Sequence, residues 1–182
     1  VLLDLSAAFD TIDHDILLYR LHHVFGIQGT ALSWFRSYLT NRFQMVSIKG
    51  TLSDPVELCY GVPQGSVLGP ILFILYMQPL SHVILNHPVS HMLYADDTQV
   101  YKSCNANDLP STILCIEKCV SDIKTWMLSN KLQMNEDKTE VLLVTPKRVA
   151  KSEPFPAFMN INGTSVKFCP SLRNLGITLD ST

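Results

Sequence analysis

Long apolar segments are absent from this sequence. The longest uninterrupted one, Ile71 to Met77, is far shorter than the ~20 residues that a helix needs to cross a bilayer. The N-terminal residues also lack the charged, apolar and small-residue succession of a signal peptide. We therefore expect a protein without a membrane partner, located inside the cell.

Paired cysteines and an excess of positive charge are missing too. The five cysteines are an odd number without paired spacing, and they form no zinc pattern with the six histidines. Reduced, buried thiols are therefore expected rather than disulfides. The net charge is −2, whereas a dedicated nucleic-acid-binding domain usually presents a basic face. Residues 1–91 carry four Lys and Arg and residues 92–182 carry ten, so a basic groove wall would come mostly from the second half.

What is present indicates a globular chain. Its 182 residues are 47% hydrophobic and 16% charged, which suits one domain with a real core. Val1 falls inside an apparent strand, and Asp180 to Thr182 follow another strand without a cap. We therefore expect residues 1–182 to be a partial domain, truncated at both ends.

Adjacent carboxylates mark the segment Met92 to Tyr101. Asp96 and Asp97 lie between two short β-prone runs, a pattern that predicts strand, tight turn and strand. A solvated turn would explain the pair, because Asp is common in turns. A second observation favours a functional site: Asp4 interrupts the apolar strand Val1 to Leu5. A buried carboxylate is costly unless its charge is compensated, and a divalent cation shared with Asp96 and Asp97 would compensate it.

The remaining patterns predict an α/β (α+β) fold, with an antiparallel sheet that carries the three acids. Helices at 70–80 and 111–130 are expected to back this sheet. Asp13 and Thr30 are candidate N-caps of two earlier helices. Hairpins are predicted over 43–60 and, on Asn162-Gly163, over 158–166. Other predictions are strands at 141–144 and 172–179, the first preceded by residues 132–138, and a polar connection containing Lys147, Arg148 and Lys151.

Three segments, in this order, carry a family resemblance. They are Leu3 to Asp10 (LDLSAAFD), Gly61 to Ser66 (GVPQGS) with Gly69-Pro70, and Tyr94 to Asp97 (YADD). Together they resemble the successive boxes of reverse transcriptases, most closely those of non-LTR (LINE-like) retrotransposons, and further similarity runs nearly to Thr182. The resemblance implies an RNA-directed DNA polymerase core of the right-hand type, here its palm, with fingers and thumb largely missing.

The resemblance also implies roles for individual residues. Asp4, Asp96 and Asp97 would be catalytic and would bind two Mg²⁺ ions, with Mn²⁺ as an alternative, helped by the Leu5 carbonyl. Phe9 would lie under the nucleotide sugar, unless it is simply a core aromatic, and Gln64 and Gly65 would support the nucleotide and template. Lys138 would protonate the leaving pyrophosphate, although a solvated turn lysine is an equal alternative. Leu175 and Gly176 would belong to the turn that grips the primer.

The implied partners are an RNA template, a DNA primer and a deoxynucleoside triphosphate, in the nucleus and cytoplasm. An endonuclease region is expected elsewhere in the parent protein. One alternative is a non-catalytic descendant that binds RNA or a protein. Another is an RNA-copying RNA polymerase, which usually has an Asp where this chain has Phe9 and is therefore disfavoured.

Overall fold

The computed structural model describes residues 1–146 and 155–181. These residues form two compact units. The first unit is Val1–Ser6, Pro79–Ser129 and Gln133–Thr182, and the second is Ala7–Gln78 with Asn130–Leu132. Within the described part of the chain, no helix is both long and apolar enough to cross a membrane. The predicted connection at Lys147, Arg148 and Lys151 lies outside the described residues.

The first unit is built on a six-stranded sheet. Its strands, in spatial order, are β6 (Ser90–Tyr94), β7 (Asp97–Tyr101), β1 (Leu2–Ser6), β8 (Gln133–Leu142), β10 (Thr164–Cys169) and β9 (Phe158–Ile161). The pairs are antiparallel except for β8 and β10, which run parallel. The α/β class is confirmed, but the prediction of an antiparallel sheet is wrong at this pair. The parallel pairs are Phe168 with Val141 and Cys169 with Leu142.

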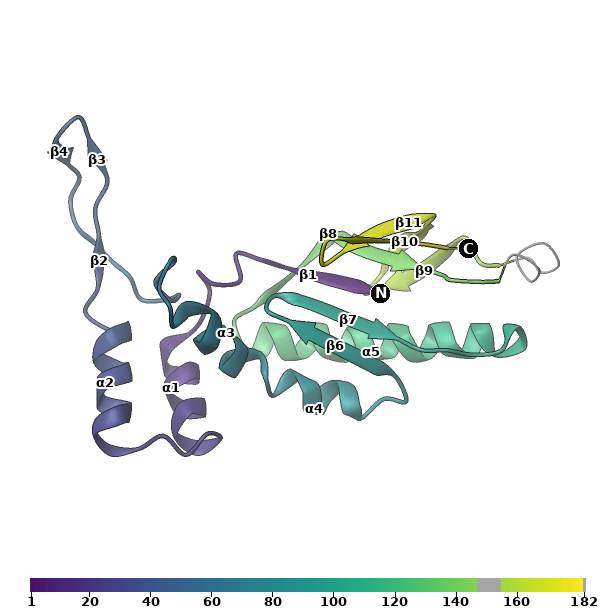
Figure 1. Ribbon diagram of the computed structural model, residues 1–182, viewed down its shortest axis with the longest axis horizontal. Helices are drawn as coiled ribbons and strands as arrows, with labels where there is room; N and C mark the ends of the chain where they lie inside the picture. The colour runs from purple at the N-terminus through teal and green to yellow at the C-terminus, as the bar shows by residue number, and fades with distance from the viewer. Residues whose placement is uncertain (147–154, 182) are drawn as a thin grey trace. The chain divides into compact units, whose positions relative to one another are not determined.

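Two helices of the first unit cover one face of this sheet (Figure 1). They are α5 (Leu109–Ser129), which follows a short 3₁₀ turn η1 (Ala106–Asp108), and α4 (Leu80–Leu85). Helix α5 contacts β8 and β9, and α4 contacts β6. The apolar stripe predicted for α5 is the buried one, with Ile116, Val120 and Ile123 in the core. The sequence patterns did not predict α4 as a separate helix, because it follows α3 after only two residues.

The strands at the end of the chain differ from the prediction. The strand predicted over 141–144 is the end of a longer strand, β8, which begins at Gln133 and ends at Leu142. The strand predicted over 172–179 is instead a hairpin of β11 (Ser171–Asn174) and β12 (Ile177–Asp180), which forms its own two-stranded sheet. The predicted Asn162-Gly163 turn is confirmed, since both residues have the positive φ angles, 53° and 91°, that a type I′ turn needs.

The second unit contains three helices, α1 (His14–His23), α2 (Gly29–Leu39) and α3 (Gly69–Met77). Asp13 caps α1 as predicted, because its carboxylate accepts a hydrogen bond from the Ile16 amide. The prediction for Thr30 is wrong: α2 starts one residue earlier, with Gln28 at its N-cap. Helix α3, the helix predicted at 70–80, packs against α1 and belongs to this unit.

A buried arginine holds the second unit together. Arg20 of α1 donates hydrogen bonds to the Tyr76 carbonyl of α3 and to Asn130, and its guanidinium lies 4.5 Å from the centre of the Tyr76 ring. The Tyr76 hydroxyl donates to the Asn130 carbonyl, and burial raises the pKa of Tyr76 to about 12.

A projecting hairpin of β2 (Phe43–Gln44), β3 (Ser47–Ile48), β4 (Thr51–Leu52) and β5 (Val56–Glu57) completes the unit.

Candidate active site

Two of the predicted acids lie side by side on one face of the sheet. Strand β1 pairs with β7 through Leu2 with Gln99 and Leu3 with Thr98, and continuing this register by one step places Asp4 beside Asp97. Alternate residues point to opposite faces. Leu3 and Thr98 are buried on the helix-covered face, at 2% and 0% exposure, whereas Asp4 and Asp97 are half-buried. The pairing register therefore turns both carboxylates away from the core.

Asp96 belongs to the turn that precedes β7. Strands β6 and β7 form a hairpin whose loop is Ala95-Asp96, as the sequence predicted. Ala95 has a φ of 51°, a left-handed conformation that costs a residue with a Cβ roughly 1–2 kcal/mol. The hairpin thus stores backbone strain next to the acids, as is common at functional sites.

Lys138 reaches Asp4 from the other neighbouring strand. Strand β8 pairs with β1 through Glu140 with Leu2 and through Asn135 with Asp4, so β8 contains extra residues between these pairs. Such a bulge bends a strand and redirects its side chains. Lys138 lies in this bulge, and its Nζ is 3.1 Å from Oδ2 of Asp4. Its side chain is otherwise exposed, at 69%.

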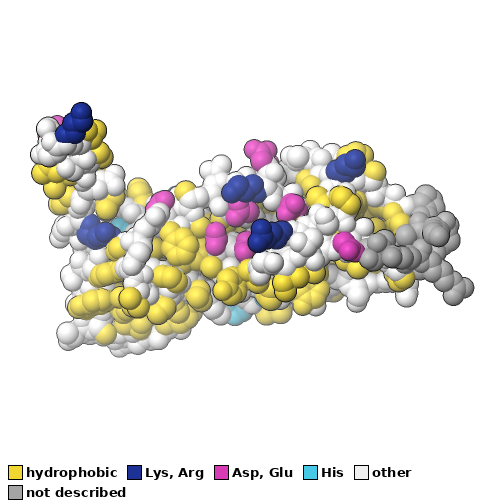
Figure 2. All heavy atoms as spheres, turned by 45° about the horizontal axis from the view of Figure 1, so that its top comes forward, with side chains coloured by type: hydrophobic (Ala, Val, Ile, Leu, Met, Phe, Trp, Pro, Cys, Tyr) yellow, Lys and Arg dark blue, Asp and Glu magenta, His cyan; other side chains and the backbone are white. Residues whose placement is uncertain are grey.

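Asp4, Asp97 and Lys138 line one open pocket of about 410 Å³, and Asp96 is not among its lining residues. On the face shown in Figure 2, acidic and basic side chains gather in one region and interrupt the apolar surface. The pocket contains both Asp4 and Asp97 with Lys138, and its further residues are Leu2, Leu3, Asp137, Glu140 and Arg173. The arrangement can therefore bind cations through its carboxylates and anions through its two basic groups.

The three carboxylates act on one another electrostatically. The pKa of Asp97 is raised, first by burial and then by the negative charges of Asp96 and Asp4. Like charges that share a site disfavour ionisation, and a cation bound among them would relieve that repulsion. The ammonium of Lys138 compensates part of the negative charge at Asp4.

The donor set fits a hard divalent cation. Mg²⁺ prefers oxygen ligands and is usually held by one or two carboxylates, together with water and substrate phosphates. Among the described residues, no three Asp, Glu, His or Cys side chains are arranged as a complete metal site, so the protein would supply only part of the coordination shell. The Leu5 side chain is buried in the core, and its backbone pairs with Met134.

The predicted nucleotide-binding residues belong to the second unit. Phe9 stacks on the buried ring of Phe73, with centroids 4.8 Å apart. The Phe9 side chain is half-buried, so it is a part of the core that also reaches the surface. Gln64 donates a 2.9 Å hydrogen bond to Asp10. Gly65 has a φ of 76° with open space at its Cα, so this glycine is needed for its backbone conformation rather than for a close approach.

Backbone hydrogen bonds connect the loop that contains Gln64 to residues 9–12. Val62 N donates to the Phe9 carbonyl, and Gly61 N donates to the Ile12 carbonyl. A Cβ on Gly61 would lie 3.0 Å from both the Cα and the carbonyl oxygen of Asp10. Only glycine permits this approach, and the first two sequence boxes of this unit therefore form one local structure.

Leu175 and Gly176 form the two-residue turn between β11 and β12. Both have positive φ angles, 47° and 84°, and Arg173 of the same hairpin lines the pocket with Asp4 and Asp97. The predicted primer-grip turn is therefore a turn, and its hairpin borders the acids. Sequence reasoning assigned no role to Gln99, although its position two residues after Asp97 places it on the same face of β7.

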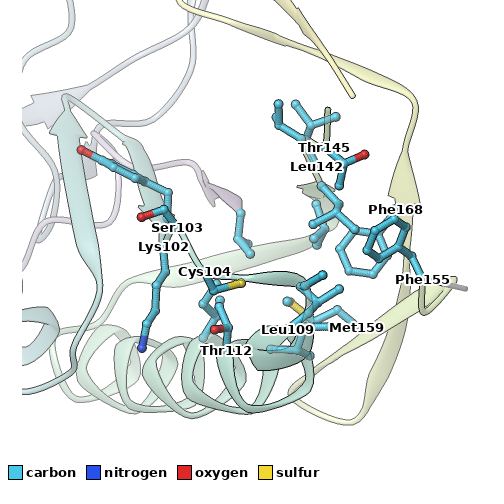
Figure 3. Close-up of a pocket in the computed structure, with 18 of the residues that line it drawn as sticks. Lys102, Ser103, Cys104, Leu109, Thr112, Leu142, Thr145, Phe155, Met159 and Phe168 are labelled. Atoms are coloured by element: carbon cyan, nitrogen blue, oxygen red, sulfur yellow. The ribbon is translucent and has the colours of Figure 1, made fainter. Parts of the chain in front are cut away.

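A second pocket of the first unit has a different character. It has a volume of about 580 Å³, and none of the residues that line it is one of the three acids. Figure 3 shows Leu109, Phe155, Met159 and Phe168 converging on it, whereas the ammonium end of Lys102 points away. Most of the residues that line it are apolar, and none of them is a carboxylate that could bind Mg²⁺. The candidate site is therefore the smaller pocket, which contains Asp4 and Asp97.

Comparison with known proteins identifies the family of this chain. The family model described as "Reverse transcriptase (RNA-dependent DNA polymerase)" matches residues 1–179, so the chain belongs to the reverse transcriptase family. It is 30% identical to a probable RNA-directed DNA polymerase from transposon BS of Drosophila melanogaster, over 99% of this chain and 20% of that protein. It is 28% identical to the RNA-directed DNA polymerase from mobile element jockey of the same species, over 98% and 19%.

A more distant relative is the Pol polyprotein from the type-1 retrotransposable element R2 of Popillia japonica. The identity is 23%, over 100% of this chain and 31% of that protein. The predicted resemblance to reverse transcriptases of non-LTR retrotransposons is thereby confirmed. The chain spans about a fifth to a third of the length of these relatives.

Proposed function

We propose that this chain is the palm region of an RNA-directed DNA polymerase. The reaction is the attack of a primer 3′-hydroxyl on the α-phosphate of a deoxynucleoside triphosphate, with loss of pyrophosphate, on an RNA template. One observation supports this function most directly. Asp4 and Asp97 are neighbours on one face of the sheet, next to the turn that carries Asp96, in a chain that matches the reverse transcriptase family throughout.

In this proposal Asp4, Asp96 and Asp97 hold two Mg²⁺ ions, with Mn²⁺ as an alternative and the Leu5 carbonyl as a further ligand. Such ions activate the hydroxyl and neutralise the charge that develops on the leaving group. The raised pKa of Asp97 supports the assignment, because it marks a place where negative charges repel one another before a cation binds.

The other residues would position the substrates. The Phe9 ring would lie beneath the sugar and exclude a ribose 2′-hydroxyl, while Gln64 and Gly65 would support the nucleotide and the templating base. Lys138, already beside Asp4, would meet the pyrophosphate and supply its proton. Leu175 and Gly176 would contact the end of the primer.

The complete enzyme would need more than this chain. We propose that fingers, thumb and an endonuclease region belong to the parent protein, as the greater length of the relatives suggests, and that it works in the nucleus and cytoplasm. The chain covers only about a fifth of the length of these relatives, so the 182 residues alone should extend primers little or not at all.

The test is primer extension on an RNA template by a protein that contains this chain with the flanking regions of its relatives. Asp96→Asn keeps the size of the side chain but removes a charge from the site. Metal-assisted charge stabilisation is worth several kcal/mol and each ~1.4 kcal/mol is tenfold in rate, so extension should fall by orders of magnitude. Primer–template binding should persist, because most contacts are to phosphates elsewhere.

The outcomes separate the alternatives. Equal extension by the unaltered protein and the Asp96→Asn variant would rule out the assignment of the acids. Retained RNA binding without extension by either protein would favour a non-catalytic descendant. Preferential use of ribonucleotides by the unaltered protein would favour an RNA polymerase.

A further inference from the structure

The hairpin of β11 and β12 is not part of the six-stranded sheet. It forms a separate two-stranded sheet, and an isolated hairpin of this kind is at best marginally stable in water. Its four-residue strands therefore need other contacts to remain in place beside the acids. The structure provides such contacts at both ends of the hairpin.

The open end of the hairpin is held by backbone hydrogen bonds. The Thr145 amide, which follows β8, donates to the Ser181 carbonyl at 2.9 Å, and the Ser181 amide donates to the Pro170 carbonyl at 2.9 Å. Leu172 is buried, at 5% exposure. These contacts fix the hairpin near residues 170–172 and 181, but they lie at the end away from the turn.

At the turn end, the side chains of Gln99 and Asn174 connect the hairpin to β7. Gln99 Nε2 donates to Asn174 Oδ1 at 2.9 Å, and the bond is partly buried. Gln99 lies two residues after Asp97 and therefore on the same, acid-bearing face of β7. The alternate residues Thr98 and Val100 are fully buried on the opposite face. Asn174 immediately precedes the Leu175-Gly176 turn. The pair thus links the strand of Asp97 directly to the turn.

We propose that Gln99 and Asn174 are positioning residues that hold the Leu175-Gly176 turn in register with Asp97. This inference rests on the proposed function, in which the turn contacts a DNA primer. The 3′ end of that primer must reach the three acids. Arg173 of the same hairpin lines the acid pocket, so its guanidinium keeps its place through the same bond. Gln99 and Asn174 act through the hairpin and do not touch the reacting atoms.

Physical chemistry indicates why one bond is enough. Leu175 adopts a φ of 47°, which is unfavourable for a residue with a Cβ, so the turn tends to relax when its anchor is lost. The bond contributes about 1 kcal/mol, or roughly a fivefold change in the local opening equilibrium. A displacement of ~1 Å at reacting groups costs about a hundredfold in rate, so a small relaxation of the turn has a large catalytic effect.

The first test uses the 182-residue chain and needs no activity. Asn174→Leu removes the acceptor at similar size, whereas Asn174→Asp keeps an oxygen that can accept from Gln99. Amide hydrogen exchange around residues 173–178 should become roughly fivefold faster in Asn174→Leu and in Gln99→Leu. Exchange in β1 should not change, and Asn174→Asp should restore slow exchange. Unchanged exchange in both leucine variants would overturn the anchor.

The second test uses the protein with its flanking regions. Primer extension by Asn174→Leu should show a kcat lowered by about ten- to a hundredfold with little change in KM for the nucleotide, and Asn174→Asp should recover most of it. Faster exchange with unaltered kcat would make the pair merely structural and refute the positioning role. If the unaltered protein extends no primer, the proposed function fails, whereas the exchange experiment still decides whether the pair holds the turn.

Discussion

The ammonium nitrogen of Lys138 lies 3.1 Å from Oδ2 of Asp4, on strands whose pairing is interrupted by a bulge between them. A regular ladder would alternate the side chains of β8 without interruption, whereas the extra residues bring Lys138 to the acid-bearing face. The lysine thus holds a cationic group where the proposed function requires a metal ion. The two cations should compete for the same carboxylate.

Replacing Lys138 with Gln should therefore strengthen divalent-cation binding by the 182-residue chain. An exposed ion pair is worth about 0.2–1 kcal/mol, which corresponds to an affinity gain of up to roughly fivefold. Titration with Mn²⁺, followed by electron paramagnetic resonance, measures the gain directly. Asp4→Asn should lower the affinity in the same assay, and weaker binding by Lys138→Gln would show that the lysine assists the ion.

Removing the charge of Asp97 should stabilise the metal-free chain at pH 7. The pKa of Asp97 is raised in the folded state, so ionisation of this group destabilises the fold above that pKa and has no effect below the ordinary value of 3.8, where both states are protonated. Asp97→Asn should gain about 0.2–1 kcal/mol, the usual size of a cross-strand charge effect.

The stability gained by Asp97→Asn should shrink as the pH is lowered through the pKa of Asp97 towards 3.8. Urea unfolding in the presence of a chelator, repeated at several pH values, would measure this change. Asp54→Asn, on the exposed hairpin of the second unit, is a control for a charge change outside the site. A loss of stability in Asp97→Asn at pH 7 would contradict the repulsion among the three acids.

Phe9→Val should relax the choice of sugar in the protein with its flanking regions. The ring is proposed to exclude the 2′-hydroxyl by a clash, so a smaller side chain should raise ribonucleotide use relative to deoxynucleotide use by about tenfold or more. The loss of stacking on Phe73 should cost roughly 1–3 kcal/mol of stability, which urea unfolding records separately. Unchanged sugar discrimination would make Phe9 a core residue only.

Gly61→Ala should disturb the loop of Gln64, and the chain offers a matched control. Gly61 and Gly50 have similar φ angles, 82° and 85°, but only at Gly61 would a Cβ meet neighbouring backbone, at 3.0 Å, since Gly50 has nothing within 4 Å. Gly50→Ala should cost only the conformational strain, roughly 1–2 kcal/mol. Gly61→Ala should cost about 1–3 kcal/mol more, because overpacking forces the backbone to move. Equal losses of unfolding free energy would contradict a tight contact at Gly61.

Local patterns predicted the parts of the site better than their assembly. The Asp96-Asp97 turn, the Asp13 cap and the Asn162-Gly163 hairpin each depend on a few adjacent residues, and all three were predicted. The parallel pairing of β8 with β10 and the bulge that carries Lys138 depend on strands far apart in the sequence. No local propensity encodes such pairings, because register is determined by burial across the whole sheet.

The hairpin at the end of the chain was missed for a related reason. The local pattern of residues 172–179 predicted one strand, and only the family resemblance placed a turn at Leu175 and Gly176. Leu175 is a poor turn residue, and its left-handed conformation is stabilised by the surrounding structure. Gln99 gave no signal either, since its partner Asn174 lies 75 residues further along the chain. The sites of strain and of long-range hydrogen bonds are those at which the sequence was least informative.

The central position of β1 has a consequence for how the protein is made. Leu2 pairs with both Gln99 and Glu140, so β1 must wait for two strands that are synthesised much later. At about 5–20 residues per second, a nascent chain exposes β1 for roughly 5–20 s before β7 emerges, and for longer before β8 does. During that interval Asp4 is a charged interruption in an otherwise apolar edge, and charges of this kind discourage wrong pairing with other strands. The same carboxylate that is proposed to serve the polymerase would then also protect the chain from aggregation on the ribosome.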